Sequence, residues 1–289
     1  HRTRGMMRNS LTLGEEETRQ LILDGTPYVV RIKVPENETV HFNDMIRGNI
    51  SHDTNVVDDK VLLKADGMPT YHLAVVVDDY LMKITHAFRG EEWLPSAPVH
   101  ILLWRYLGWE EQMPLWAHLP LILKPDGNGK LSKRDGDRLG FPVFAMDWKD
   151  PKTGEVTVGF RERGFLPEAF VNLLALLGWN PGIEQEIFGI EELCTLFSME
   201  RVHKGGAKFD YEKAKWFNQQ HIQRADNKRL AALAAPFFEK ENITVEREYL
   251  AKVVGLIKER CHLLSDFVPQ GRFFFEAPEQ WDLDAVKGK

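Results

Sequence analysis

The sequence contains little cysteine, which bears on its chemistry and its surroundings. Two cysteines, Cys194 and Cys261, lie far apart among its 289 residues. They form neither the paired spacing of a metal site nor a disulfide framework. His52, His100 and His118 likewise show no spacing typical of metal ligands, so we expect these histidines to be structural. Because free, unclustered cysteines are typical of reducing compartments, the sequence predicts a cytoplasmic protein.

Long apolar runs are also missing. No stretch approaches the roughly 20 apolar residues that a membrane-spanning helix requires, and residues 1–8 lack the apolar centre of a signal peptide. We therefore predict no membrane partner. A formal net charge of −6 argues against a protein that coats nucleic acid indiscriminately, but it leaves room for a local basic groove.

The chain is long for a single hydrophobic core, so its length favours two or three domains. Its first part combines a short exposed helix over 9–24 with strand-like alternation over 28–34, 39–48 and 61–64. Pro35 begins a turn signal between the first two strands. We expect these two strands to form a β-hairpin or meander.

The next part alternates strand and helix signals. A valine-rich run over 71–77 predicts a buried strand, and Asp78-Asp79 is placed to cap the helix after it. Further strands are predicted over 86–90 and 117–123, with a helix between them that begins at 91. Strands separated by helices favour a mostly parallel α/β sheet, whose ligands bind beyond the carboxyl ends of the strands.

Beyond about residue 140 the pattern is irregular and then becomes helical, which indicates a helical second domain. Short polar links separate the helices, and the sequence shows no internal repeat. The predicted helices cover 167–177, 190–197, 210–221, 226–239 and 247–264.

The basic loop is the stretch Lys130-Leu131-Ser132-Lys133-Arg134, which follows a glycine-rich turn after the strand 117–123. Three cations within five residues suit a mobile loop that closes over a polyphosphate, with lysine as a point charge and arginine as a forked donor. Positioned charge of this kind supplies much of the catalysis in phosphoryl and nucleotidyl transfer. These residues alone also allow a solvated surface loop.

Arg89 and Glu92 occupy the junction between a predicted strand and the next helix. A strand-end arginine can grip a carboxylate or phosphate with two hydrogen bonds, and a glutamate one turn later can accept from an amine or a ribose hydroxyl. Both could instead be charges at a helix start. Tyr71 and His72 could line a pocket or simply pack, and the basic stretch 201–208 could contact a phosphodiester backbone or solvent.

A series of motifs stands along nearly the whole chain in a definite order and spacing. The first half contains Gly67-Met68-Pro69-Thr70-Tyr71-His72-Leu73-Ala74, Arg89-Gly90-Glu91-Glu92-Trp93, Ala117-His118-Leu119-Pro120-Leu121-Ile122 and the basic loop. The second half contains Gly164-Phe165-Leu166-Pro167-Glu168-Ala169, Leu177-Gly178-Trp179 and Phe209-Asp210-Tyr211-Glu212-Lys213-Ala214-Lys215-Trp216-Phe217-Asn218. In this series the chain closely resembles bacterial glutamyl-tRNA synthetases, which are class I aminoacyl-tRNA synthetases.

The resemblance implies an enzyme that activates L-glutamate with ATP and Mg²⁺ and transfers it to tRNA(Glu). Lys130 and Lys133 match catalytic lysines of the family, and Tyr71 and Arg89 match positions that bind glutamate. The cysteine cluster that binds zinc in some members is missing, so no zinc is expected. The positions that match the nucleotide site are Glu92, Ile122, Lys130, Leu131, Ser132, Lys133 and Arg134.

The resemblance also implies an α/β fold with three parts. Residues 1–66 match a β-rich insertion that binds the tRNA acceptor end, and 67–145 match the second half of the class I nucleotide-binding, Rossmann-like domain. Residues 146–289 match a helical stem-contact domain and the start of an anticodon-binding region. Because the family's first signature, a His-Ile/Val-Gly-His type segment, is absent, we expect an internal fragment that cannot form glutamyl-adenylate alone. We also expect a monomer.

Two other functions are compatible with these motifs. Glutaminyl-tRNA synthetase shares the fold and differs in whether its side-chain pocket offers a cation to a carboxylate. A non-catalytic tRNA-binding module derived from a synthetase would bind tRNA without binding nucleotide. The intact basic loop favours descent from an active enzyme.

Overall fold

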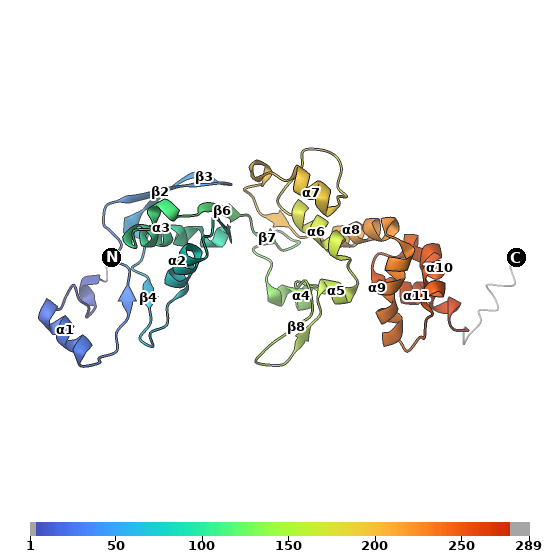
Figure 1. Ribbon diagram of the computed structural model, residues 1–289, viewed down its shortest axis with the longest axis horizontal. Coiled ribbons are helices and arrows are strands. Elements are labelled where there is room, and N and C mark those ends of the chain that lie inside the picture. The colour runs from blue at the N-terminus through green and yellow to red at the C-terminus, as the bar shows by residue number, and fades with distance from the viewer. Residues whose placement is uncertain (1–3, 278–289) are drawn as a thin grey trace. The chain divides into compact units, whose positions relative to one another are not determined.

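A computed structural model describes residues 4–277 of the chain, and for Lys133, Arg134 and Asp137 it describes the backbone alone. The chain forms two compact units, the first comprising His1–Leu121 with Val202–Lys204 and the second Ile122–Arg201 with Gly205–Lys289. Figure 1 shows the elements of the described residues in chain order by colour. Among these residues, one cluster of buried apolar side chains lies in the first unit and two lie in the second. Within residues 4–277, no helix is both long enough and apolar enough to cross a membrane.

The first unit begins with the exposed helix α1 (Glu15–Leu23), as predicted. The predicted hairpin between 28–34 and 39–48 is wrong, because β1 (Val30–Arg31) pairs with β4 (Val61–Leu63). The true hairpin joins β2 (Thr39–Asp44) to β3 (Gly48–Asp53), a strand that the alternating pattern did not reveal.

Asp44 explains where β2 ends. Its carboxylate oxygen Oδ1 accepts hydrogen bonds of 3.0 Å from the amides of both Ile46 and Arg47. This local bonding turns the chain within the predicted strand, and Gly48 then follows with a φ of +78° that favours glycine.

The main sheet of the first unit has the strand order β3-β2-β6-β5. Strand β5 (His86–Gly90) runs parallel to β6 (Leu115–Leu119), and β6 also touches β2 in the parallel sense. The 3₁₀ helix η3 (Glu91–Ser96) and helix α3 (Ala97–Tyr106) connect β5 to β6. The predicted α/β architecture with parallel strands is therefore confirmed.

The valine-rich run 71–77 is a helix, so its assignment as a buried strand is wrong. Helix α2 (Tyr71–Leu81) begins after Thr70, which has an extended backbone. Valine disfavours helices only weakly, and packing of this segment on α3 and β4 overrides that preference. Asp78-Asp79 consequently lies inside the helix and caps nothing.

The predicted strand 117–123 is interrupted. Strand β6 ends at Leu119, and β7 (Ile122–Leu123) starts the second unit. Pro120 stands between them and has no N–H to continue a ladder. Strand β7 pairs in parallel with β10 (Ala207–Lys208).

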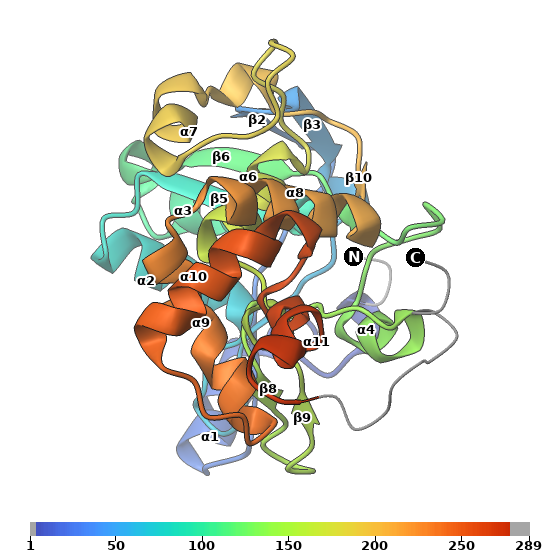
Figure 2. The same cartoon turned by 90° about the vertical axis from the view of Figure 1, so that its right-hand side faces the viewer.

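The rest of the second unit is mainly helical, as predicted, with a small hairpin of β8 (Trp148–Lys149) and β9 (Val156–Thr157). Helices α9, α10 and α11 pack on one another around a core that includes Phe238 and Leu250 (Figure 2). The helices are α4 (Lys133–Leu139), α5 (Phe160–Arg163), α6 (Pro167–Leu176), α7 (Ile190–Leu196), α8 (Tyr211–Arg224), α9 (Asn227–Lys240), α10 (Arg247–Ile257) and α11 (Phe267–Gly271).

Candidate active-site residues in the two units

Arg89 lies near the carboxyl end of β5, where its side chain is 8% exposed. Its Nη2 lies 3.2 Å from Oδ2 of Asp79, its Nη1 lies 2.8 Å from Nδ1 of His100, and its Cζ lies 4.8 Å from the ring centroid of Trp116. Burial raises the pKa of Asp79, while the nearby arginine opposes that rise. Arg89 is therefore a held, paired cation, and its remaining N–H groups are those available to a ligand.

His100 belongs to α3 and is fully buried beneath Arg89. Burial is the main cause that lowers its pKa to about 3, and the positive charge of Arg89 adds to this effect. The imidazole is therefore neutral at ordinary pH, which lets it accept a hydrogen bond from the arginine.

Tyr71, the first residue of α2, is brought to the same place. Its ring centroid lies 5.9 Å from that of His100 and 4.5 Å from that of Trp93. The two residues predicted to bind glutamate, Tyr71 and Arg89, thus share His100 as a neighbour. The pocket-lining interpretation of Tyr71 and the simple packing interpretation are both compatible with a side chain that is 43% exposed.

Glu92 and Glu91 have different environments although they are adjacent. The Glu92 carboxylate folds over Gly90, since a Cβ at that glycine would lie 2.1 Å from Oε2 of Glu92. Glu91 instead pairs with Arg47 at 2.5 Å and accepts from the amide of Leu121. Of the two, Glu92 is the one whose carboxylate lies over Gly90, the last residue of β5.

Asp44 and His118 form a second buried pair in the first unit, which sequence reasoning missed. Both side chains have no exposed surface, and His118 Nδ1 lies 2.6 Å from Asp44 Oδ2. Burial acts to raise the pKa of Asp44, but hydrogen bonds from His118, Arg47 and Ile46 outweigh it, so that the pKa is lowered. The residues are 74 positions apart, and no local pattern signals the contact.

In the second unit, the basic loop lies directly beside Ile122. The amide of Leu131 donates to the carbonyl of Ile122 at 2.8 Å, and Leu123 forms a bridge with Lys130. The structure thus brings together Ile122 and the loop that were assigned to the nucleotide site. Lys208, from the basic stretch 201–208, packs over Gly127 in the turn that leads into the loop.

The last part of the basic loop is not a loop. Lys133 and Arg134 form the first turn of α4, so the prediction of a mobile loop over the whole of 130–134 is wrong there. Ser132 is the N-cap residue of this helix, and Oδ2 of Asp135, in the first turn, accepts hydrogen bonds from the Oγ and the backbone N–H of Ser132, at 2.5 and 2.9 Å. Serine followed three residues later by an acidic residue is a capping signature, which could have identified the helix.

Asp135 is a structural partner of the basic loop that the sequence analysis did not identify. Besides Ser132, its carboxylate meets Lys124 at 3.4 Å and Arg138 at 3.1 Å. The hydrogen bonds from Ser132, followed by those from the two cations, hold its pKa well below the usual range. A permanently charged Asp135 therefore anchors the basic loop to the turn before it and the helix after it.

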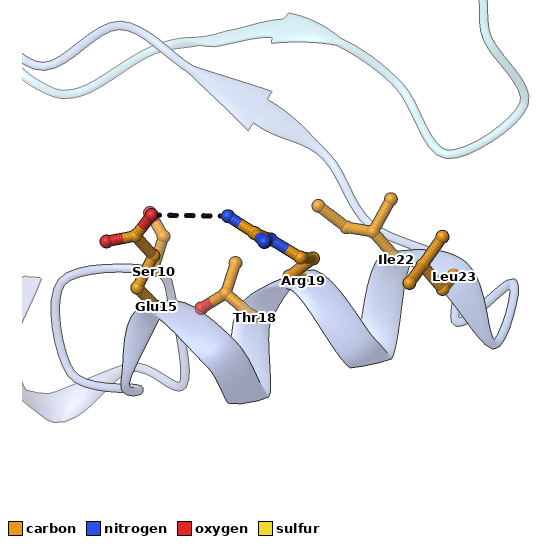
Figure 3. A pocket seen from close by; sticks show the side chains of 6 residues that line it. All are labelled: Ser10, Glu15, Thr18, Arg19, Ile22 and Leu23. Carbon is orange, nitrogen blue, oxygen red and sulfur yellow. Dashed lines mark ion pairs between the residues drawn. The ribbon is translucent and has the colours of Figure 1, made fainter.

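A separate pocket of about 520 Å³ lies along α1 (Figure 3). Glu15 and Arg19 form an ion pair of 3.5 Å across it, and the apolar side chains of Ile22 and Leu23 lie at its other end. It contains none of the predicted site residues.

Comparison with known proteins identifies the relatives of this chain. Residues 1–216 match the family described as tRNA synthetases class I (E and Q), catalytic domain, and residues 229–289 match an anticodon binding domain. The glutamate–tRNA ligase of Porphyromonas gingivalis is 56% identical over 286 residues, which are 99% of this chain and 56% of the relative. That of Phocaeicola vulgatus is 56% identical over 97% of this chain and 56% of the relative.

Solved structures show the same similarity. A glutamate tRNA ligase from Elizabethkingia meningosepticum, in complex with its amino acid, has a TM-score of 0.90 and 49% identity, covering 99% of this chain and 57% of its own. A glutamate-tRNA synthetase from Elizabethkingia anophelis has a TM-score of 0.91 and 50% identity, covering 99% and 58%. The chain thus spans little more than half the length of the relatives it matches.

Proposed function

We propose that this chain, which belongs to the family of class I tRNA synthetases for glutamate and glutamine, serves glutamate–tRNA ligation. The reaction is the ATP-dependent activation of L-glutamate to glutamyl-adenylate, followed by transfer to tRNA(Glu). The observation that carries the proposal is that Arg89 and Tyr71 both contact the buried His100, in a chain 56% identical to glutamate–tRNA ligases.

Tyr71 and Arg89 would bind the glutamate. Asp79, His100 and Trp116 fix the guanidinium without using all of its N–H groups, and a fixed arginine fork suits a carboxylate ligand. The tyrosine hydroxyl beside it can add a hydrogen bond. This cation is the feature that favours glutamate over glutamine as the substrate.

The nucleotide would be bound by Glu92, Ile122 and the basic loop of residues 130–134, with Mg²⁺ accompanying ATP. Lys130 and Lys133 would neutralise charge on the phosphates during adenylate formation, which is electrostatic catalysis by positioned cations. The capping contact between Ser132 and Asp135 supports this role, since it fixes the backbone from which these lysines extend.

The tRNA would contact both ends of the chain. We assign residues 1–66 to its acceptor end, 67–145 to the catalytic domain, and 146–289 to the stem and the start of the anticodon-binding region. The match of residues 229–289 to an anticodon binding domain supports the last assignment. A monomeric, cytoplasmic enzyme remains the prediction from sequence.

A chimeric ligase tests this function. In it, the matching 56% of the Porphyromonas gingivalis ligase is replaced by this chain. The chimera should support glutamate-dependent ATP–pyrophosphate exchange, and Lys133→Ala should lower its rate by about 100-fold or more with little change in the KM for glutamate. Equal losses in rate and glutamate affinity would contradict the role of Lys133.

Separate binding measurements on the purified chain address the non-catalytic alternative. A pure tRNA-binding module would bind tRNA(Glu) and show no ATP affinity that depends on Lys133. Binding of ATP that weakens in Lys133→Ala, with tRNA binding nearly unchanged, would support the enzymatic function.

A further inference from the structure

Four polar side chains in the first unit form one continuous series of hydrogen bonds. Asp79 and His72 come from α2, Arg89 from β5 and His100 from α3. The link from Asp79 through Arg89 to His100 continues from Nε2 of His100 to Nδ1 of His72, at 3.0 Å. A fully buried histidine therefore joins the predicted glutamate-binding arginine to the residue that follows Tyr71.

Arginine fixes the direction of every hydrogen bond in this series, because it has no acceptor atom. Arg89 donates to Nδ1 of His100, which must therefore carry no proton. Neutral His100 holds its proton on Nε2 and donates it to Nδ1 of His72. Neutral His72 then carries its own proton on Nε2, at the far end of the series from Arg89.

The charges around the two histidines favour these neutral forms. Burial is the main cause that lowers the pKa of both side chains. The nearby groups Arg89, His72 and His118 lower the pKa of His100 further. Lys60 does the same for the pKa of His72. Asp79, the acidic group in the series, bonds Arg89 and neither histidine. A second proton on His100 would place an N–H against the guanidinium of Arg89.

We propose that His100 is a positioning residue, which orients the guanidinium of Arg89 and holds His72 in the tautomer whose Nε2–H is a hydrogen-bond donor. The donor would serve an acceptor oxygen of the amino-acid substrate, beside Tyr71, whose ring centroid lies 6.0 Å from that of His72. This inference rests on the proposed function for its substrate, but the protonation pattern itself does not depend on any ligand.

The protonation pattern can be measured directly on the purified chain. ¹⁵N NMR of the imidazole rings should show both His72 and His100 neutral at pH 7, each with a protonated Nε2 and a bare Nδ1. His72→Gln and His100→Gln assign the signals among the ten histidines. A proton on Nδ1 of either ring, or a cationic ring at pH 7, would overturn the proposal.

Two substitutions separate positioning from packing. His100→Leu removes both hydrogen bonds while filling the site, so His72 should become a mixture of tautomers. His100→Gln offers an acceptor to Arg89 and a donor to His72, and should restore the Nε2–H form. His86→Gln, at an exposed histidine that bonds Thr85, serves as the control and should leave the His72 signal unchanged.

The functional consequence is read in the chimeric ligase. His100→Leu should raise the KM for glutamate by about tenfold, the effect of losing a hydrogen bond to a charged group, with the KM for ATP unchanged. His100→Gln should recover most of that loss. If the KM for glutamate were unchanged in His100→Leu while the NMR pattern was as expected, the positioning role alone would be overturned. If the chimera were inactive with every substrate, the proposed function itself would be contradicted.

Discussion

Arg89 illustrates how a buried cation can be kept ready for an anion. Asp79 neutralises part of its charge, His100 accepts one of its hydrogen bonds, and Trp116 lies beneath its face. Removing one partner from such a group leaves the other uncompensated, which costs far more than an exposed ion pair contributes. The arginine should therefore be sensitive to changes in residues that touch no substrate.

A pH dependence of folding follows from His100. Its pKa is about 3 in the folded chain against an ordinary 6.5, so the unfolded chain binds the proton more readily between these values. Stability contributed by the neutral form is complete above pH 6.5 and is lost as the pH falls below it, by up to about 1.4 kcal/mol per pH unit for one group.

Urea unfolding at pH 7.5, 6.5 and 5.5, followed by tryptophan fluorescence, measures this loss. The free energy of unfolding should fall less steeply with decreasing pH in His100→Gln than in the unaltered chain. The lowered pKa values of Asp44 and Asp59 act only in more acidic solution, and the difference between the two proteins at each pH isolates the contribution of His100. Identical slopes for the two proteins would contradict the assignment of a neutral, buried His100.

The family motifs in the sequence predict Arg89 and Tyr71 as site residues but not their partners. His100 is 11 residues from Arg89 and 28 from His72, and the three residues lie on three different elements. It was therefore interpreted as merely structural. Contacts of this kind are decided by the packing of α2, α3 and β5, which no local pattern encodes.

At the scale of elements, helix α4 fixes the backbone of Lys133 and Arg134, the last two residues of the basic loop. Asp135→Ala should remove the acceptor for both donors of Ser132 and the anion that faces Lys124 and Arg138. We expect amide hydrogen exchange in α4 to become roughly fivefold faster, as for loss of a helix cap, and ATP binding to weaken.

Asp126→Ala is the matched control, because the Asp126 carboxylate accepts a hydrogen bond from the amide of Asn128 in the preceding turn. Similar exchange rates in α4 for both variants would refute the anchoring role.

Helix α8 is tied to two loops by one buried side chain. Asn218 accepts from the amide of Leu166 and donates to the carbonyls of Gly164 and His262, at 2.7 to 3.1 Å. Asn218→Ala removes this partner from the buried amide of Leu166 and from the partly buried carbonyl of His262, whereas Gly164 keeps a bond from Leu264. We expect a loss of about 2–5 kcal/mol in the free energy of unfolding.

Urea unfolding monitored by circular dichroism gives this loss. Gln219→Ala, at the next position of α8, removes a single exposed hydrogen bond to the carbonyl of Glu259 and should cost less than about 1 kcal/mol. If the two variants were equally stable, Asn218 would not be the link that the geometry indicates.

Periodicity in the sequence locates most elements, but it fails for the valine-rich run 71–77 and for the hairpin of β2 and β3. Four predicted helices of the second unit agree with α6, α7, α8 and α9 within three residues, because their apolar positions repeat with the helical period. The predicted helix 247–264 ends at Ile257, and the short helices α4, α5 and α11 are not predicted by this pattern. The run 71–77 reads as a strand from its valines, yet becomes α2 because its neighbours pack it as a helix. The hairpin of β2 and β3 is not evident in the sequence because its turn rests on hydrogen bonds to Asp44 and on the single glycine Gly48, without a cluster of turn residues.

At the scale of the whole molecule, the residues predicted to bind substrates are distributed over both compact units. Tyr71, Arg89 and Glu92 belong to the first unit, whereas Ile122 and the basic loop belong to the second. Family motifs in the sequence predicted the α/β fold, the helical part and the family itself. The roles of individual residues and the boundaries of the three segments remain predictions, because they depend on ligand contacts that neither a local sequence pattern nor the fold determines.

The measurement that tests the central claim most directly is amino-acid-dependent ATP–pyrophosphate exchange by the chimeric ligase, with glutamate and glutamine compared under the same conditions. We predict exchange with glutamate, little with glutamine, and loss of the preference in Arg89→Gln, because the carboxylate then loses its cation. Preference for glutamine, or a preference for glutamate that survives in Arg89→Gln, would contradict the account.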